Sequence, residues 1–198
     1  MNAKAYPPIK LIAGLGNPGA EYEQTRHNAG QTFVEELAIK YAAPLTLQSK
    51  HKAYTSKALI GDQSVHLVVP TTFMNLSGYA IASLASFYKI LPEEILVAHD
   101  ELDLPCGRVR FKNGGGHGGH NGLRDTIQKL ANQNGFARLR IGIDHPGHAK
   151  QVASYVLKRA PKEQYEKTEQ AMQAALADTE IFVAGDREGA MRTLHSAT

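Results

Sequence analysis

The stretch Lys10-Leu11-Ile12-Ala13-Gly14 has the composition of a short buried strand that runs into a glycine turn. A second apolar run, Ile95-Leu96-Val97-Ala98, has the same character and ends at His99-Asp100. The segments around these two runs alternate between strand and helix patterns. This alternation predicts an α/β fold, in which a mixed, partly parallel, twisted sheet is covered by helices on both faces.

Apolar periodicity assigns the remaining elements. Phe33, Val34 and Leu37 recur at helical spacing, and Gly61-Asp62 is a hairpin signal between two strand-like runs. Further strands are predicted over residues 53–60, 64–69, 108–112 and 137–143, and helices over residues 29–42, 76–89, 121–130, 150–158 and 161–183.

The length of 198 residues fits one domain, and we expect residues 1–8 to be a loose lead-in and residues 9–198 to form a single domain. The single cysteine, Cys106, cannot form an internal disulfide. The chain has no apolar run long enough to span a bilayer, and its first residues lack the apolar stretch of a signal peptide. These features predict a soluble cytoplasmic protein that does not enter a membrane.

Positive charge is concentrated in one part of the chain. Residues 104–162 contain 11 Lys and Arg against 2 Asp and Glu, a net charge of +9, whereas the net charge of the whole chain is +3. Such a concentration favours a polyanionic partner, most often nucleic acid.

Two predicted strands in this basic segment alternate charged and apolar residues. Arg108, Arg110 and Lys112 share one face of the first strand, and Arg138 and Arg140 share one face of the second. The segment lacks an aromatic-rich platform for stacking bases, which favours recognition of the phosphate backbone. We expect Lys112 and Arg140 to contact phosphates.

Residues 114–122 read Gly-Gly-Gly-His-Gly-Gly-His-Asn-Gly. Six glycines in nine positions cost backbone entropy and give a core nothing to pack, so they indicate close backbone approach or unusual torsions. The interleaved His117, His120 and Asn121 favour a functional site over a merely flexible loop.

Polar residues fall at the ends of the predicted elements. Asn17 follows the first strand, Asn75 stands at a helix start, Asp100 ends a strand, and Asn121 begins a helix after the glycine loop. Because sites in open α/β sheets form outside the carboxyl ends of strands, we expect these loops to converge on one cleft.

His27, just before a predicted helix, is a candidate general base, and Asp100 could orient its imidazole. The chain has no G-x-S-x-G motif, and Cys106 between proline and glycine is better explained by packing. Water is then the economical nucleophile, which suggests hydrolysis. Neutral amides, such as those of Asn17 and Asn75, could hold a water or polarise a carbonyl group.

Two other site classes are weaker. Residues 14–19 match the dinucleotide fingerprint G-x-G-x-x-G, but Pro18 stands where that motif opens a helix, and no second strand with a terminal acid follows about 20 residues on. Histidines and acids around the glycine loop lack an H-E-x-x-H helix or a cysteine pair, so we expect no required metal.

Six motifs together resemble the bacterial peptidyl-tRNA hydrolases, in order and over nearly the whole chain. They are GLGNPG at residues 14–19, TRHNAG at 25–30, PTTFMN at 70–75, HDELDLP at 99–105, GGGHGGHNG at 114–122 and RLRIG at 138–142. Each motif is weak alone, and the set is highly specific. Cys106 departs from the family, which commonly has proline at that position.

The resemblance implies a single α/β domain that cleaves the ester between a peptide, or an N-blocked aminoacyl group, and the 3′-terminal ribose of tRNA. Free tRNA then returns to translation. It implies that His27 is the catalytic base, that Asp100 supports it, and that Asn17 helps to discriminate blocked from free aminoacyl ends.

The resemblance also implies the residues of the substrate site. Those for the tRNA end and the peptide are Tyr22, Phe73, Asn75 and Asn121, and the supporting residues are Met74 and His120. It further implies no cofactor, no obligate protein partner and a monomer.

A non-catalytic RNA-binding module and a dinucleotide-dependent oxidoreductase remain as alternatives. In the RNA-binding module, the basic strands would bind RNA, and His27 and Asp100 would have no catalytic role.

Overall fold

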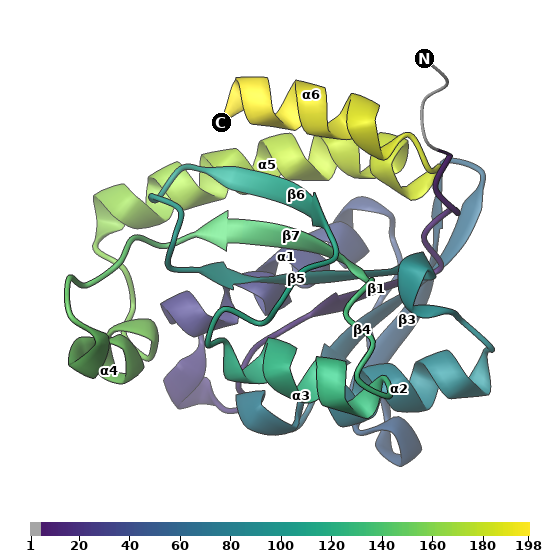
Figure 1. Cartoon of the computed structure of the whole chain (residues 1–198), viewed down its shortest axis with the longest axis horizontal. Coiled ribbons are helices and arrows are strands. Elements are labelled where there is room, and N and C mark those ends of the chain that lie inside the picture. Colours follow the sequence, from purple (N-terminus) through teal and green to yellow (C-terminus); the bar gives the residue numbers. More distant parts are fainter. Residues whose placement is uncertain (1–4) are drawn as a thin grey trace.

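The predicted strand around Leu11 lies at the centre of a seven-stranded sheet (Figure 1). In this computed structural model, which describes residues 5–198, the strand order is β2-β3-β4-β1-β5-β7-β6. The strands are β1 (Leu11–Gly14), β2 (Thr46–Gln48), β3 (Ala53–Ile60), β4 (Gln63–Pro70), β5 (Ile95–Glu101), β6 (Val109–Asn113) and β7 (Ala137–Gly142).

The sheet is mixed, as predicted. β1 runs parallel to β4 and β5, and β5 runs parallel to β7. The outer pairs, β2 with β3, β3 with β4, and β6 with β7, are antiparallel. Every residue of β1 is buried, as expected for a parallel strand covered on both faces.

Helices cover both faces of the sheet, which confirms the predicted fold class. The helices are α1 (Ala29–Lys40), α2 (Gly78–Phe87), α3 (Asn121–Lys129), α4 (Val152–Val156), α5 (Lys162–Val183) and α6 (Arg187–Ala197). Short 3₁₀ turns connect them: η1 (Ala20–Tyr22), η2 (Arg26–Asn28), η3 (Ser49–His51), η4 (Met74–Leu76), η5 (Pro92–Glu94) and η6 (Ala149–Gln151). Apolar residues of α1, α5 and α6 form one core cluster, and those of α2 and α3 form the other.

The structure adds two elements that the pattern analysis did not predict, β2 and α6. β2 has only three residues, all exposed, so it carries little apolar periodicity. For α6 a signal existed: Asp186 is its N-cap and accepts a hydrogen bond from the Gly189 N–H. Asn75 lies in η4, one short turn before α2, rather than at the helix start.

Two glycines let α1 pack directly on the sheet. A β-carbon on Gly30 would collide with the carbonyl oxygen of Ala98 in β5, and one on Gly14 would collide with the carbonyl oxygen of Gly30. The first turn of α1 therefore lies against the backbone of β1 and β5, and this contact brings the η2 turn to the end of β5.

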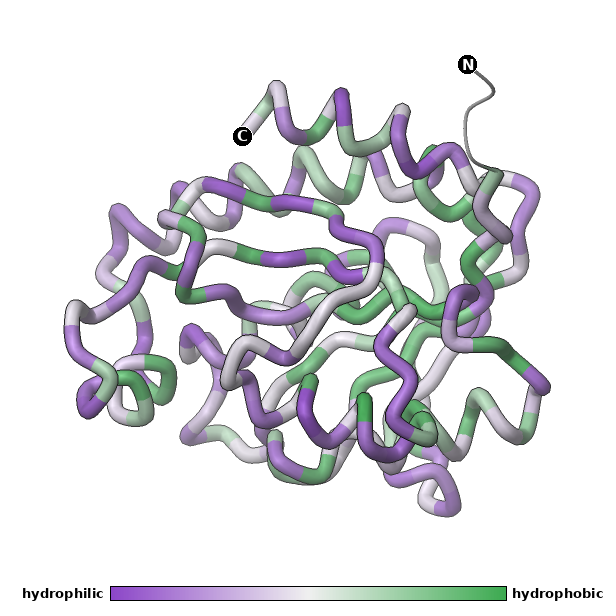
Figure 2. Tube along the Cα trace, in the orientation of Figure 1, coloured by the Kyte–Doolittle hydropathy of each residue, from purple (hydrophilic) through white to green (hydrophobic). Residues whose placement is uncertain are grey.

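The edge strand β6 is covered by α6. The Phe111 N–H donates to His195 Nε2 (3.1 Å), and the Val109 N–H donates to Thr198 Oγ1 (3.4 Å). Both donors would otherwise be free on the outer side of an edge strand. In Figure 2, hydrophobic and hydrophilic residues alternate along β6 and β7, so one face is apolar and the other is polar.

Arg187 joins the chain start to the sheet. Its buried guanidinium donates to Asn113 Oδ1 (3.0 Å) and to the carbonyl oxygens of Pro7 and Glu93. Residues 1–4 of the expected lead-in lie outside the described residues, and the boundary at residue 8 stays a prediction. Within residues 5–198, no helix has the length and apolar character needed to cross a membrane.

Candidate active site

A cleft of about 700 Å³ opens at the carboxyl ends of the central strands. The loop after β1, the η4 turn, the end of β5, the glycine loop and α4 all contribute to its walls. The predicted site residues that line the cleft are Asn17, His27, Phe73, Met74, Asn75, Asp100, His120 and Asn121. The expected convergence of the loops is confirmed.

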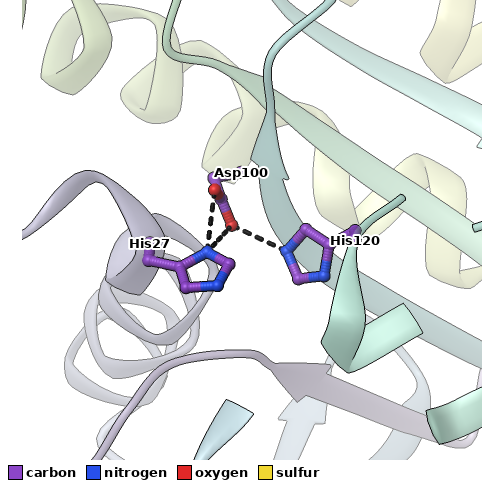
Figure 3. A group of neighbouring side chains, drawn as sticks. All are labelled: His27, Asp100 and His120. Atoms are coloured by element: carbon purple, nitrogen blue, oxygen red, sulfur yellow. Dashed lines mark hydrogen bonds and ion pairs between the residues drawn. The ribbon is translucent and has the colours of Figure 1, made fainter. Parts of the chain in front are cut away.

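His27 and Asp100 meet, as their positions at a helix start and a strand end suggested. His27 Nδ1 lies 3.0 Å from both carboxylate oxygens of Asp100 (Figure 3). The Asp100 side chain is 2% exposed and that of His27 is 13% exposed. An ionised Asp100 only accepts hydrogen bonds, so Nδ1 carries the proton and the lone pair of His27 is on Nε2.

His120 supplies a second hydrogen bond to the same carboxylate. Its Nε2 lies 2.8 Å from Asp100 Oδ1, opposite His27 (Figure 3). His120 is also the N-cap of α3, and its Nδ1 accepts the backbone N–H groups of Gly122 (3.1 Å) and Leu123 (3.3 Å). Because Nδ1 faces two donors, it must hold the lone pair, and the proton of a neutral His120 is therefore on Nε2.

The two histidines keep Asp100 ionised. Burial would raise the pKa of its carboxyl group, but the charges and hydrogen bonds of His27 and His120 outweigh burial and hold that pKa well below its usual range. Burial also opposes a charged His27, yet the Asp100 charge and hydrogen bond together raise the pKa of His27 above its ordinary value. The site is thus prepared to stabilise an imidazolium at His27.

His99 is a neighbouring residue to which sequence reasoning gave no role beyond that of a possible ligand. It is 2% exposed, donates from Nδ1 to the Asp100 carbonyl oxygen (2.8 Å), and its ring lies 5.2 Å from that of His120. Burial, reinforced by the His120 charge, lowers the pKa of His99 to about 3. His99 is therefore neutral and serves the interior of the site rather than its chemistry.

The three side chains His27, Asp100 and His120 place one ligand atom each within 4.8 Å of one another, close enough for a metal ion. The donor chemistry opposes such a use. A metal on His120 Nε2 would require the proton on Nδ1, where it would face two backbone N–H groups. The arrangement favours a proton between each histidine and Asp100.

Asn17 is held with its amide group in one orientation. Its Oδ1 accepts the Met74 N–H (2.7 Å), so its NH₂ group is the end that remains to donate toward a ligand. Asn28 fixes the backbone of the same residue: its Oδ1 accepts the Asn17 N–H (2.8 Å) and its Nδ2 donates to the Asn17 carbonyl oxygen (2.9 Å). Asn28 lies beside His27 in sequence, and its supporting role was missed.

Aromatic rings and amide side chains form the rim of the cleft. Phe73 is 54% exposed, and Tyr22 approaches it edge-on with ring centroids 6.2 Å apart. Tyr22 is outside the cleft lining, so it extends the rim rather than the floor. Asn75 and Asn121 are exposed, and Asn121 Oδ1 accepts a hydrogen bond from Arg124 (2.7 Å).

The glycine loop behaves as its composition suggested. A β-carbon on Gly122 would overlap Met74 Sδ and Leu15, so this glycine allows α3 to pack against the cleft wall. Gly118 and Gly119 have φ angles of 56° and 83°, which other residues rarely adopt. Both conformations place His120 at the start of α3.

The basic strands stand apart from the cleft lining. Lys112 is exposed opposite Arg138, and Arg138 is 2% exposed, over the ring of Phe136. Arg140 Nε donates to Glu101 Oε1 (2.7 Å) at the end of β5. The side chain of Arg138 is therefore built into the fold, while Lys112 and Arg140 lie nearer to the surface.

An oriented histidine, a buried carboxylate and neutral amides at the carboxyl ends of parallel strands define an α/β enzyme of the hydrolase class. Comparisons with known proteins agree. Residues 11–198 match the family model described as peptidyl-tRNA hydrolase. The chain belongs to the peptidyl-tRNA hydrolase family.

Individual relatives cover almost the whole chain. It is 59% identical to the peptidyl-tRNA hydrolase of Teredinibacter turnerae over 96% of this chain and 98% of the relative. The identity to the Saccharophagus degradans protein of the same name is 57%, over 96% of each chain. A crystal structure of the Acinetobacter baumannii peptidyl-tRNA hydrolase superposes with a TM-score of 0.94 and 44% identity, over 99% of both chains.

Proposed function

We propose that this chain hydrolyses the ester between a peptide, or an N-blocked aminoacyl group, and the 3′-terminal ribose of tRNA, with water activated by His27. The observation that carries the proposal is the His27–Asp100 hydrogen bond, which leaves the His27 Nε2 lone pair free beside the cleft. Membership of the peptidyl-tRNA hydrolase family supports the choice of substrate.

The reaction begins when His27 Nε2 accepts a proton from a water molecule as the water oxygen attacks the ester carbonyl carbon. Asp100 accepts the hydrogen bond of the resulting imidazolium and compensates its charge. The tetrahedral intermediate then collapses, the bond to the ribose 3′-oxygen breaks, and the imidazolium proton passes to that oxygen. The products are a free peptide acid and a tRNA with a free 3′-terminal hydroxyl group.

Asn17 acts on the acyl side of the ester. Its amide group has a single orientation, because Met74 N–H occupies its oxygen. The free NH₂ group can donate to a carbonyl oxygen, which is present in a peptide or an N-acyl group and absent from a free amino end. This geometry supports the expected discrimination between blocked and free aminoacyl ends.

The rim of the cleft and the basic strands bind different parts of the rest of the substrate. Phe73, Asn75 and Asn121 line the cleft and contact the tRNA end and the peptide. Lys112 and Arg140, outside the cleft lining, contact phosphates of the tRNA body. The reaction belongs in the cytoplasm, where translation supplies the substrate, and a monomer carries the whole site.

Incubation with N-acetyl-aminoacyl-tRNA tests the proposal. The expected result is release of N-acetyl-amino acid by the native chain and loss of release in His27→Ala. His148→Ala, an exposed histidine outside the cleft lining, is the matched control and should retain full activity. Binding of tRNA without any hydrolysis by the native chain would instead identify a non-catalytic RNA-binding protein.

A further inference from the structure

A second surface of lysines and aromatic rings lies on α2 and η3, outside the residues that line the cleft. The Lys50 ammonium group is 4.0 Å above the ring of Phe87, and that of Lys52 is 4.7 Å above the ring of Tyr79. Phe87 and Tyr79 nevertheless remain 57% and 40% exposed. Tyr88, 46% exposed, meets Phe87 edge-on at 4.8 Å.

The surface continues onto the sheet. His66 of β4 stacks on Tyr88 with ring centroids 4.0 Å apart, and Lys57 of β3 is its register partner. Burial and the Lys57 charge lower the pKa of His66, so its ring is neutral. We name the set Lys50, Lys52, Lys57, His66, Tyr79, Phe87 and Tyr88 the aromatic–lysine face.

The charge of this face is uncompensated. Between Glu36 and Glu93 the sequence contains a single acidic residue, Asp62, in the hairpin between β3 and β4. Within residues 5–198, no carboxylate forms a salt bridge with Lys50, Lys52 or Lys57. Residues 1–103 together contain 8 Lys and Arg against 10 Asp and Glu, a net charge of −2, so acids elsewhere in this segment mask the basic region in the sum.

The face is firmly attached to the fold. His51 Nδ1 and Ser83 Oγ lie 2.7 Å apart and join η3 to α2. The Thr71 N–H donates to the Lys52 carbonyl oxygen (2.8 Å), which links the face to the end of β4, just before Phe73 on the cleft rim. A ligand on this face would thus meet preformed positions beside the cleft.

We propose that the aromatic–lysine face binds single-stranded RNA, as a surface separate from the catalytic cleft and from the basic strands. Exposed aromatic rings stack bases regardless of sequence, and neighbouring lysines pair with phosphates. An acidic peptide would use the lysines but would leave the three exposed rings without a function. The proposal goes beyond ester hydrolysis, because it needs neither an acyl group nor His27.

The test uses a fluorescein-labelled single-stranded oligouridylate and the full chain carrying Lys112→Ala, which weakens binding by the basic strands. Fluorescence anisotropy gives the Kd over a series of salt concentrations. The variants are Lys50→Gln with Lys57→Gln, and Phe87→Leu, which keeps an apolar side chain without the ring. Lys162→Gln with Lys167→Gln, two exposed lysines of α5, is the control for total charge.

We expect the Lys50/Lys57 double variant to weaken binding and to reduce the log–log salt slope by about 1.4, roughly 0.7 for each single-strand phosphate contact. Phe87→Leu should weaken binding about tenfold without changing the slope. The α5 control should stay within about twofold of the parent, since its lysines lie on another helix. Hydrolysis of a truncated ester should be unchanged in all of these variants.

Equal affinities of the face variants and the α5 control would overturn the proposal. The proposal would also be overturned if polyglutamate competed as strongly as unlabelled oligouridylate and Phe87→Leu left the Kd unchanged. That result would indicate an acidic protein partner. Preferential binding to phosphatidylserine vesicles would reject it in favour of a lipid surface. Because the probe carries no ester, these outcomes are independent of whether the chain hydrolyses peptidyl-tRNA.

Discussion

His120 donates a 2.8 Å hydrogen bond to Asp100, and the first turn of α3 determines that it is the donor. The two helix N–H groups on Nδ1 fix the proton of His120 on Nε2, so the start of a helix orients the carboxylate that in turn orients His27, the proposed base. His120 therefore has two roles, as the N-cap of α3 and as a hydrogen-bond donor to Asp100, and substitutions can test the two roles separately.

His120→Asn should keep the helix cap and lose the hydrogen bond to Asp100. Asparagine is a good N-cap, so the melting temperature should change little, while kcat should fall about tenfold because the carboxylate is less well held. His120→Ala should lose the cap as well and cost about 1 kcal/mol of unfolding free energy. Denaturant unfolding and kcat for both variants check this separation. A normal kcat in His120→Asn would show that His120 does not position Asp100.

Asp100→Asn should be about as damaging as His27→Ala, with losses of about 10²–10⁴ in kcat. Asparagine at position 100 has an NH₂ group in place of one carboxylate oxygen. This group would face an N–H donor of one of the two histidines, His27 or His120. His120 cannot change its tautomer without losing two cap hydrogen bonds, so the amide NH₂ group faces His27 Nδ1 and favours the His27 tautomer that has its proton, rather than its lone pair, on Nε2. From the sequence alone, a milder loss is expected. Single-turnover rates decide, and Asp100→Asn with more than about a tenth of native kcat would refute the tautomer argument.

The pH dependence of kcat/KM should report His27. The base must be neutral to accept a proton, and Asp100 raises its pKa, so activity should fall on acidification with a midpoint above the ordinary value of 6.5. Weakening the hydrogen bond from His120 should change the height of the profile more than its midpoint. Rates measured between pH 5 and pH 9, a range chosen to span about two units either side of neutrality, give the midpoint. A midpoint below 6.5 would contradict the assigned electrostatics.

His99 should make the fold sensitive to acid. Its pKa is about 3 in the folded chain and near 6.5 when unfolded, so the unfolded state binds the extra proton between these values. The stability that this group contributes is present above pH 6.5 and is lost as pH falls, by up to about 1.4 kcal/mol per pH unit. Urea unfolding of the native chain and of His99→Asn across this range tests the effect. The unfolding free energy of the variant should change less steeply with pH than that of the native chain, whatever its stability at neutral pH. Equal slopes in the two proteins would exclude His99 as the source of the acid sensitivity.

Lys112→Ala should raise KM with little change in kcat for N-acetyl-aminoacyl-tRNA, and it should reduce the log–log salt slope of binding by about 0.7–0.9. Arg140→Ala should do the same and also lose its hydrogen bond to Glu101, which makes Lys112 the cleaner probe. A truncated ester without the tRNA body should be nearly indifferent to both. Equal damage with the truncated ester would place these residues in the catalytic cleft or the fold.

Patterns in the sequence predict the parts of this structure that depend on local periodicity. The buried runs around Leu11 and Val97 became parallel neighbours, and the convergence of Asn17, Asp100 and Asn121 followed from the rule for strand ends. The resemblance to a family then predicts which of these polar residues carry the reaction. The sequence alone makes the pairing of His27 with Asp100 a hypothesis, because the pairing depends on the close packing of α1 on β5 that Gly30 allows.

Other features depend on contacts between distant segments and leave no local pattern. Arg138 reads as a surface charge in an alternating strand, yet it is buried, because the glycine loop closes over that face of the sheet and its Gly115 carbonyl accepts a hydrogen bond from the guanidinium. The tautomer of His120 depends on where α3 begins, which the sequence places only approximately. Asn28 gave no signal beyond its place beside His27.

The cover that α6 provides for β6 has a consequence for how copies of this chain coexist. A strand with free N–H and C=O groups on its outer side is a template on which a second molecule can add its own strand. His195 and Thr198 occupy those donors, so the last helix blocks the addition of a second molecule's strand at β6. A chain without α6 would therefore present β6 as an open edge for intermolecular pairing, so a helix outside the cleft lining protects the sheet from association.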